Sequence, residues 1–501
     1  MRVRCKVRMN YWVAESRFLL LISPTSGGFY AIRKLNATEW TVSARICDRV
    51  IIKDVAIIGG GASGAYAAVR LKEDFNQSII LIEKQARIGG HVSTFDDPDT
   101  STPFDYGVNT FNDYGPAKAF FERMGVPYSA GPRTPLTTRY VDFSTGLPVP
   151  NFTPPSASDR TAALLRFLNA TEPFEPFLLP GYWNFPPASQ IPEDLLLPFG
   201  DFVSKHNLSA AVSQVFQVTG LGTRDMKNAL TIYVLSAFGP PMIRAFVGQG
   251  TTFTPDSRRN IQLYEAVQAR LGSDVLLSSV VAQSLRTGLG HTLWVKNSAT
   301  NRYSLVLARK LLIAIEPTEE NMAPFALDSA ERGMFSKFQF QTVHAGIVTH
   351  PSLPVGVSLT NTPAAAAPDN YLALPAGNFN ARYDWMGGNS TNWRVLMVGD
   401  EGFDTAAAQS LVKQDFARLV GAGTLPAGGG GQQPELGIKA WANHGLMHAH
   451  VSADEIRGGF IQKLYALQGR RGTWWTGGAF SVQFQAVLWA FDDVLLPKIL
   501  A

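Results

Sequence analysis

Cysteine is nearly absent from this chain. Of its 501 residues only Cys5 and Cys47 are cysteines, and both lie before the first strong motif. Two cysteines cannot form a disulfide framework, and the body of the chain has no thiolate with which to bind a metal or attack a substrate. Any catalysis in that body must therefore use other groups.

A strong net charge and long apolar runs are also missing. The formal net charge is +4 and 17% of the residues are charged, so the composition does not predict a nucleic-acid-binding surface. No apolar run approaches the roughly 18 residues of a membrane-spanning helix, so no integral membrane segment is expected. With 46% apolar residues over this length, the sequence predicts a globular protein of two linked domains.

The first 50 residues form an N-terminal arm or a possible signal region. The stretch from Met1 to Arg8 is basic, but only about five residues, Phe18–Ile22, are continuously apolar where a signal peptide needs about 7–15. Asn-x-Ser/Thr sequons predict a glycoprotein if the chain is secreted; they begin at Asn36, Asn76, Asn151, Asn169, Asn207 and Asn389. Secretory and cytoplasmic locations stay equally open.

The stretch Asp54–His91 organises the rest of the chain. The apolar run Val55–Ile58 predicts a buried parallel strand that passes directly into the glycine-rich turn Gly59–Gly64. Helical spacing of apolar residues follows, and a second apolar run, Ile79–Ile82, ends in Glu83, about 20 residues after Gly64. This order of elements predicts a βαβ nucleotide-binding unit in an α/β fold of Rossmann type.

The glycines of the turn have separate physical roles. Gly59 permits a tight strand-to-helix turn, Gly61 lets the backbone approach a pyrophosphate, and Gly64 lets the helix pack closely on the strand. The free N–H groups and the positive dipole end of the helix then face the phosphates. The first helical residues that offer these groups are Ala62 and Ser63. The turn therefore predicts a dinucleotide site.

Glu83 and the residues after it indicate which dinucleotide is bound. Glu83 is placed to accept hydrogen bonds from an adenosine ribose. The following Gly89-Gly90-His91 resembles the glycine pair of glutathione reductase-like and flavin-containing amine oxidase-like proteins, where Gly90 would pass close to FAD. Amine oxidases usually carry an arginine after the pair. Here His91 takes that place and is expected to face the phosphates, and Arg87 supplies the positive charge.

Later segments resemble the same family in the same order. Leu277–Val281 resembles the step whose valine backbone contacts the adenine, which assigns that contact to Val281. Two places resemble the turn that closes the flavin site. One is Gly477, followed by an apolar helix to Leu500, and the other is Asp400 at the end of an apolar strand. We favour Gly477 and keep Asp400 as the alternative.

The resemblance implies a discontinuous FAD-binding domain with an interleaved α+β substrate domain. We expect residues 51–130, 255–320 and 440–501 in the first, and residues 131–254 and 321–439 in the second, the substrate or cap domain. Helices are predicted within 114–125, 199–246 and 261–271. The proline- and aromatic-rich stretch 131–198 fits a substrate wall better than a flexible linker, because its aromatic side chains need burial.

The family that these motifs resemble is the flavin-containing amine oxidases, specifically the branch similar to beta-cyclopiazonate dehydrogenase of fungal secondary metabolism. It implies hydride transfer from a small organic substrate, of amine or indole type, to flavin N5, with dioxygen or another acceptor regenerating the flavin. Trp475 is the one candidate catalytic residue, as an aromatic wall facing the flavin. A flavin-dependent isomerase of an unsaturated substrate and a non-catalytic FAD-binding protein stay open as alternatives.

The FAD is expected to be held without a covalent bond. Monoamine oxidases tether their flavin through a cysteine near the C-terminal motif, and the stretch Thr473–Phe491 contains none. His444, His448 and His450 lie close together, but no evident carboxylate or thiolate accompanies them, so no metal site is predicted.

Overall fold

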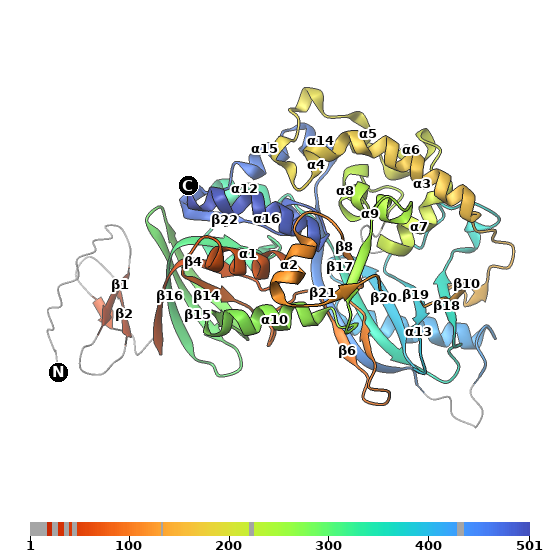
Figure 1. Ribbon diagram of the computed structural model, residues 1–501, viewed down its shortest axis with the longest axis horizontal. Coiled ribbons are helices and arrows are strands. Elements are labelled where there is room, and N and C mark those ends of the chain that lie inside the picture. Colours follow the sequence, from red (N-terminus) through yellow and green to blue (C-terminus); the bar gives the residue numbers. More distant parts are fainter. Residues whose placement is uncertain are drawn as a thin grey trace.

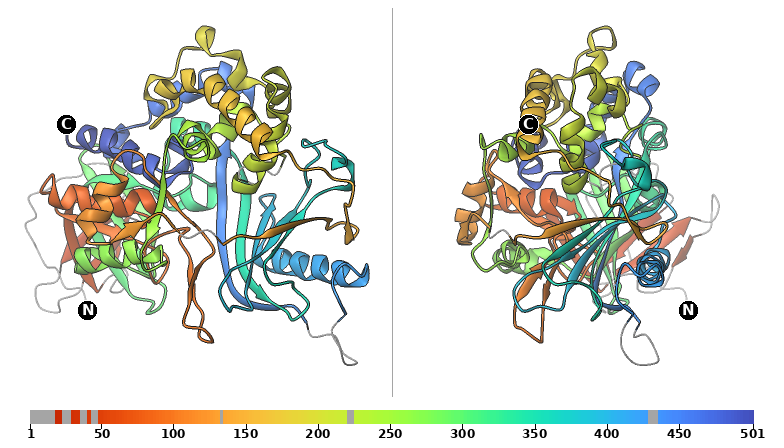
Figure 2. Two further views of the ribbon diagram at one scale, coloured as in Figure 1. Left: turned by 45° about the vertical axis from the view of Figure 1, so that its right-hand side comes forward. Right: turned by 90° about the vertical axis from the view of Figure 1, so that its right-hand side faces the viewer.

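A computed structural model describes residues 18–22, 29–34, 40–42, 48–131, 134–219, 225–427 and 435–501. The chain forms an α/β region that carries the glycine turn, a second sheet with one long helix, and a layer of short helices above both (Figures 1 and 2). The N-terminal arm contributes an antiparallel ribbon of β1 (Phe18–Ile22), β2 (Phe29–Lys34) and β3 (Trp40–Val42). Most of the possible signal region, both cysteines and Asn36 lie outside the described residues.

The glycine turn begins at the centre of a parallel sheet. Its five parallel strands are, in spatial order, β13 (Val275–Leu276), β5 (Ile79–Ile82), β4 (Arg49–Ile58), β16 (Tyr303–Ile313) and β22 (Thr473–Trp475). All of β5 and the last four residues of β4 are buried, which explains their continuous Ile and Val content, because parallel sheets are covered on both faces. The carboxyl ends of these strands share one edge, where such sheets bind ligands.

An antiparallel ribbon and several helices complete this region. β14 (Ser279–Thr287) pairs with β15 (Gly290–Asn297), and β15 pairs with the first half of β16. On the same edge of β16, its last residues pair with β22. The helices around the sheet are α1 (Ala62–Glu73), α2 (Ala117–Met124), α10 (Ile261–Leu271) and α16 (Gln485–Leu500). Trp489 of α16 donates its indole N–H to the Ala62 carbonyl at 3.1 Å, which fixes α16 against the start of α1.

The second sheet has its own core. Its strands are, in spatial order, β11 (Leu147–Pro148), β10 (Thr137–Asp142), β18 (Val357–Asn361), β19 (Phe379–Trp385), β20 (Trp393–Gly399), β17 (Gln339–Thr349) and β21 (Gly437–His450). Helix α13 (Thr405–Gly421) packs on it through Val412 and Phe416, which join Tyr383 and Met397 in one buried cluster. Figure 2 shows β17 and β21 running through the middle of the molecule.

Short helices form the cap above both sheets (Figure 1). They are α3 (Ala157–Thr171), α4 (Glu175–Leu178), α5 (Glu193–Leu196), α6 (Phe199–Lys205), α7 (Ser209–Thr219), α8 (Thr231–Ala237) and α9 (Pro240–Phe246), joined by α14 (Ala453–Arg457) and α15 (Phe460–Tyr465) from near the C-terminus. Smaller elements connect the regions: β6 (Thr94–Asp96), β7 (Pro103–Asp105), β8 (Phe111–Asn112), β9 (Tyr128–Ser129), β12 (Thr252–Pro255) and α11 (Glu319–Met322).

Two predicted helices and one predicted domain boundary can be compared with the structure. Helix α10 has the predicted bounds, and α2 ends at Met124, just before its C-cap Gly125, whose φ of 67° suits a glycine. The predicted boundary at residue 440 falls inside β21, a strand of the second sheet. None of the described helices is long and apolar enough to span a membrane.

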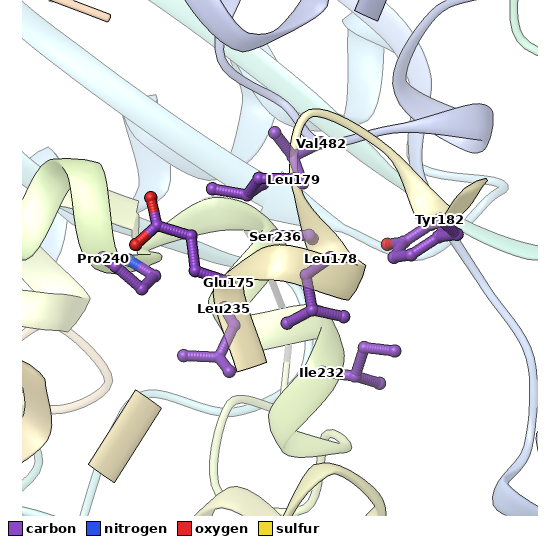
Figure 3. A pocket seen from close by; sticks show the side chains of 9 residues that line it. All are labelled: Glu175, Leu178, Leu179, Tyr182, Ile232, Leu235, Ser236, Pro240 and Val482. Carbon is purple, nitrogen blue, oxygen red and sulfur yellow. The ribbon is translucent and has the colours of Figure 1, made fainter. Parts of the chain in front are cut away.

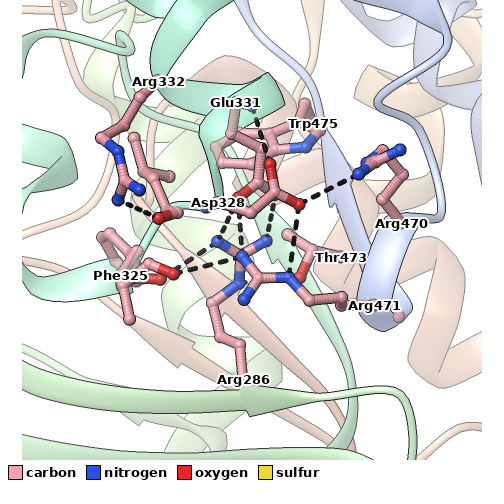
Figure 4. A network of polar contacts seen from close by, with 12 residues as sticks. Arg286, Phe325, Asp328, Glu331, Arg332, Arg470, Arg471, Thr473 and Trp475 are labelled. Atoms are coloured by element: carbon pink, nitrogen blue, oxygen red, sulfur yellow. Dashed lines mark hydrogen bonds and ion pairs between the residues drawn. The ribbon is translucent and has the colours of Figure 1, made fainter.

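A buried ion-pair network fixes the strand that leads to the C-terminal turn (Figure 4). Arg286 of β14 and Glu331 of α12 (Ser329–Phe335) have fully buried side chains, and Arg286 Nη2 donates to Glu331 Oε1 at 2.5 Å. Arg471 donates to the other Glu331 oxygen at 2.7 Å, and Arg286 Nε donates to Thr473 Oγ1 at 3.0 Å. The network therefore ties β14 and α12 to the start of β22.

Candidate functional site

The glycine turn has the close contacts that a nucleotide-binding turn requires. Gly59 has a φ of 98°, which a residue with a side chain rarely adopts. A Cβ on Gly64 would lie only 1.9 Å from the Gly59 carbonyl oxygen, so helix and strand touch at this point. Both positions therefore require glycine for the fold itself, whatever the site binds.

Gly61 and Gly90 form a cradle without side chains at the start of α1. A Cβ built on Gly90 would lie 3.0 Å from the Gly61 Cα. The first turn of α1 has no acidic residue, and its N-cap, Gly61, offers no side-chain oxygen to the free N–H groups. The Ser63 hydroxyl in this turn is buried without a hydrogen-bond partner. Unsatisfied donors beside a cradle of glycines are what a bound pyrophosphate would satisfy.

Glu83 closes the loop beside this cradle. Its side chain is buried, and its two carboxylate oxygens accept hydrogen bonds from the backbone N–H groups of Gly60 and Gln85, both at 2.7 Å. The Glu83 backbone pairs with Leu276 and Ser279, at 2.9 and 2.8 Å, which brings the start of β14 and its Val281 to the same edge. The structure thus collects the predicted adenosine-binding residues in one place, and their contacts with a ribose and an adenine stay predictions.

Arg87 and His91 lie on either side of the glycine pair. Arg87 is partly buried and donates to the Ile88 carbonyl at 3.2 Å and to Ser93 Oγ at 3.4 Å. Burial lowers the pKa of its guanidinium. The Arg87 side chain is therefore directed back along the loop that carries the glycine pair.

His91 lies against β21, which passes next to the glycine pair. Its ring stacks on His444 of β21, with ring centroids 4.8 Å apart, and its Nε2 lies 3.1 Å from the His444 carbonyl oxygen. The expected contact of His91 with the phosphates stays a prediction. Burial lowers the pKa of His91 to about 4, so the imidazole is neutral at pH 7.

The C-terminal turn lies on the nucleotide sheet, whereas Asp400 does not. The Thr476 N–H donates to the Ile313 carbonyl at 2.9 Å, so Gly477 follows the strand next to β16. Gly477 has a φ of 105°, and the space where its Cβ would stand is open. Asp400 ends β20, which pairs with β17 and β19 in the second sheet. Strand pairing therefore favours Gly477 as the closing turn.

Trp475 lies in the core. Its side chain is fully buried, stacked on Phe480 at 15° and edge-on to Phe335, with the Arg286 guanidinium 5.5 Å from its ring centroid. A ring enclosed in this way by other side chains packs the core, and a catalytic role for Trp475 stays a prediction.

The cap meets the C-terminal turn around a small cavity (Figure 3). The Gln483 N–H donates to the Ser236 carbonyl of α8 at 3.1 Å, and Val482 joins the lining of the cavity. Glu175 is the one charged residue of the lining, and Arg244 neutralises it through hydrogen bonds of 3.0 and 2.6 Å. The cavity volume is about 10 Å³, which is the room of a single water molecule. A substrate therefore needs more space than this cavity offers.

Sequence reasoning gave His444 and His448 no role. Their spacing was visible, but His91, the ring that stacks on His444, is 353 residues away in the chain. Among the described residues, no group of three or more His, Cys, Asp or Glu side chains is placed to hold a metal ion.

Comparisons with known proteins identify the family. The model of an NAD(P)-binding Rossmann-like domain matches residues 57–124. FAD-dependent oxidoreductase pigF of Monascus ruber is 32% identical over 454 residues, which are 90% of this chain and 93% of that protein. Beta-cyclopiazonate dehydrogenase of Aspergillus oryzae is 32% identical over 450 residues, 89% and 93% of the two chains. The chain belongs to this family of FAD-dependent oxidoreductases.

Solved structures share the fold of this FAD-dependent oxidoreductase. A fatty acid isomerase from P. acnes has a TM-score of 0.68 at 17% identity, over 90% of this chain and 99% of that one. Putrescine oxidase bound to putrescine has a TM-score of 0.56 at 14% identity over 90% and 99%, and cyclohexylamine oxidase from Brevibacterium oxydans has 0.56 at 16% over 89% and 98%. These likenesses show the fold alone. They confirm the predicted amine oxidase-like α/β architecture, and the family confirms FAD as the cofactor.

Proposed function

We propose that this oxidoreductase oxidises a small organic substrate, of amine or indole type, by hydride transfer to N5 of FAD. The observation that carries the proposal is the cradle of Gly61 and Gly90 with the unpartnered Ser63 hydroxyl at the start of α1. When bound, FAD supplies a two-electron acceptor, which dioxygen or another acceptor then regenerates. The similarity to a protein named beta-cyclopiazonate dehydrogenase supports a dehydrogenation.

The chain's own residues would hold and orient the cofactor. The N–H groups at the start of α1 would bind the pyrophosphate, with Arg87 as the nearby cation. Glu83 and the backbone of Val281 would bind the adenosine half. The remaining residues of the proposed FAD site are Gly59, Ala62, Gly64, His91 and Gly477. The substrate domain would cover the reacting end and exclude water from it.

Anaerobic flavin bleaching tests the function. Purified protein is incubated without oxygen with indole amines, polyamines and polyenes, and the absorbance of the oxidised flavin is followed. Bleaching by an indole or amine compound, with the oxidised product found in equal amount, is the expected result. A polyene whose double bonds move without bleaching would replace the proposal with an isomerase. A bound flavin that no compound in the panel bleaches or converts would support a non-catalytic FAD-binding protein.

A further inference from the structure

Two histidines of β21 have ring nitrogens without partners. Nε2 of His444 and both ring nitrogens of His448 are buried and make no hydrogen bond, and His448 as a residue is 9% exposed. A neutral imidazole has one N–H donor and one acceptor nitrogen. Leaving such groups buried and unpaired is costly, so buried polar groups without partners in a native fold call for a ligand or a bound water.

The backbone around His448 is built to turn this side chain. His448 has a φ of 56°, a left-handed conformation that a residue other than glycine rarely adopts, and Gly445 has a φ of 72°. The pairing of β21 with β17 shifts register between Gln339 and Gln341 and again between Thr342 and His344, opposite this part of β21. Strain and bulges of this kind re-aim side chains and gather next to functional sites.

His444 and His448 lie next to several parts of the proposed site. His444 stacks on His91, which follows the glycine pair. His450, two residues beyond His448, contacts Tyr233 of the cap helix α8 with ring centroids 5.8 Å apart. The short helix η8 (Gly478–Phe480), which follows the C-terminal turn, packs beside β21. His444 and His448 therefore lie where the glycine pair, the C-terminal turn and the cap meet.

The surroundings of His444 and His448 disfavour a positively charged ligand group. Burial holds the pKa of His444 well below its usual value and lowers that of His448 to about 3, so both rings are neutral at pH 7. Among the described residues, no carboxylate accepts a hydrogen bond from Nε2 of His444 or from either ring nitrogen of His448. An ammonium group brought here would lose its hydration without gaining a counter-ion, which is costly, whereas an uncharged N–H or O–H group would find an acceptor nitrogen and a donor.

We propose that His444 and His448 are the substrate-recognition groups of this enzyme and bind an uncharged N–H or O–H group of the substrate, not a protonated amine. This inference rests on the proposed function and narrows it, because it favours an indole N–H or a neutral hydroxyl over an alkylamine as the group that is recognised. His444 and His448 orient the substrate through these hydrogen bonds.

A matched set of small probes tests the charge preference on the wild-type holoenzyme. Isothermal titration calorimetry at pH 7.5 compares benzyl alcohol with benzylamine, which has the same shape but is protonated, and adds indole and toluene. Benzyl alcohol and indole are expected to bind at least tenfold more tightly than benzylamine. Equal or tighter binding of benzylamine would overturn the inference without any variant being needed.

Substitution of His448 tests the residue. His448→Phe keeps an aromatic ring but removes both nitrogens, and we expect it to weaken benzyl alcohol and indole binding at least tenfold while toluene binds as before. His448→Asn, which keeps a donor and an acceptor, is expected to recover part of the loss. Unchanged probe affinities in a His448→Phe protein with full flavin content would mean that these nitrogens bind only water, and would overturn the inference.

The two proposals fail separately. Wild-type protein that is folded but carries no flavin would contradict the proposed function. Flavin that indole compounds bleach normally, together with probe affinities that do not respond to His448→Phe and His444→Phe, would leave the function in place and remove only the recognition role of the histidines.

Discussion

Gly61, the N-cap of α1, and Gly90, in the loop after β5, meet with no side chain between them. A Cβ on Gly61 would have its nearest neighbour, the Gly90 Cα, at 3.8 Å, which is an ordinary contact. Gly61→Ala should therefore leave the flavin-free fold unchanged, yet place a methyl group where the pyrophosphate is proposed to lie. We expect at least a tenfold weaker FAD affinity, measured by fluorescence titration of the deflavinated protein, and a larger loss for Gly61→Val.

Two other glycines serve as controls for this prediction. Gly64→Ala would bring a Cβ to 1.9 Å from the Gly59 carbonyl oxygen, so it should lower the melting temperature or abolish soluble expression, with or without FAD. Gly421→Ala at the end of α13 meets nothing within 4 Å and should change neither stability nor flavin content. A Gly61→Ala protein that binds FAD as tightly as the wild type would remove Gly61 from the site.

Removing one partner of the buried ion pair between Arg286 and Glu331 should lower the stability of the fold strongly. Both side chains are 0% exposed, so Glu331→Gln leaves the buried Arg286 without its counter-charge, whereas Arg471 keeps an ion pair with Asp328 at 3.8 Å. Breaking such a pair typically costs about 3–5 kcal/mol. We expect a loss of this order in the free energy of unfolding from urea titration.

An exposed ion pair provides the comparison. Arg270 and Glu73 have side chains that are 46% and 25% exposed, and pairs of this kind contribute about 1 kcal/mol or less. Glu73→Gln should therefore change the urea midpoint little. Equal effects of the two substitutions would contradict the view that the Glu331 network holds β22 in place.

Local sequence order was sufficient to predict the nucleotide turn. Val55–Ile58, the glycines and Glu83 lie within about 30 residues, and the structure places them in one βαβ unit as expected. Helix α10 likewise follows from the apolar period of its own residues. These features depend on contacts between near neighbours in the chain, which a pattern can reveal.

Contacts between distant segments could not be predicted in the same way. The strands before Asp400 and before Gly477 are both short and apolar, and only their pairing, with β17 in one case and with β16 in the other, distinguishes them. The predicted domain boundary at residue 440 lies inside β21, which is long enough to run from the second sheet to the glycine pair. Because β21 runs to the glycine pair, the ring of His444 stacks on that of His91. No spacing in the sequence indicates this contact.

The attachment of the flavin can be tested by acid precipitation. None of the described residues is a cysteine, and the His91 Nε2 already has the His444 carbonyl as its partner at 3.1 Å. We therefore expect a yellow supernatant and a colourless pellet when the holoenzyme is precipitated with trichloroacetic acid. Flavin fluorescence that stays with the denatured chain would contradict noncovalent binding, and His91→Ala would then be the first variant to make.

Asp415 of α13 should make the stability of the second sheet depend on pH. Its side chain is buried, and burial raises the pKa of the carboxyl from its ordinary value of 3.8 to about 7, although Arg418 donates to it at 2.7 Å. A pKa raised in the folded state gives a stability contribution that is complete below about pH 4 and is lost as the pH rises through about 7. The loss by pH 8 is at most about 4 kcal/mol.

Asp415→Asn replaces the ionisable carboxyl with a neutral amide, so it should flatten the dependence of stability on pH. The buried histidines act in the opposite direction, because their lowered pKa values make the fold less stable as the pH falls below about 6.5, and they act equally in both proteins. The informative quantity is therefore the difference in unfolding free energy between variant and wild type, from urea titrations at pH 5, 6, 7 and 8. We expect that difference to shift in favour of the variant as the pH rises. Only the wild type has a carboxyl that must become charged while buried in the core of the second sheet. A difference that stays constant from pH 5 to pH 8 would show that Asp415 is already ionised in the folded protein, with Arg418 outweighing the cost of burial.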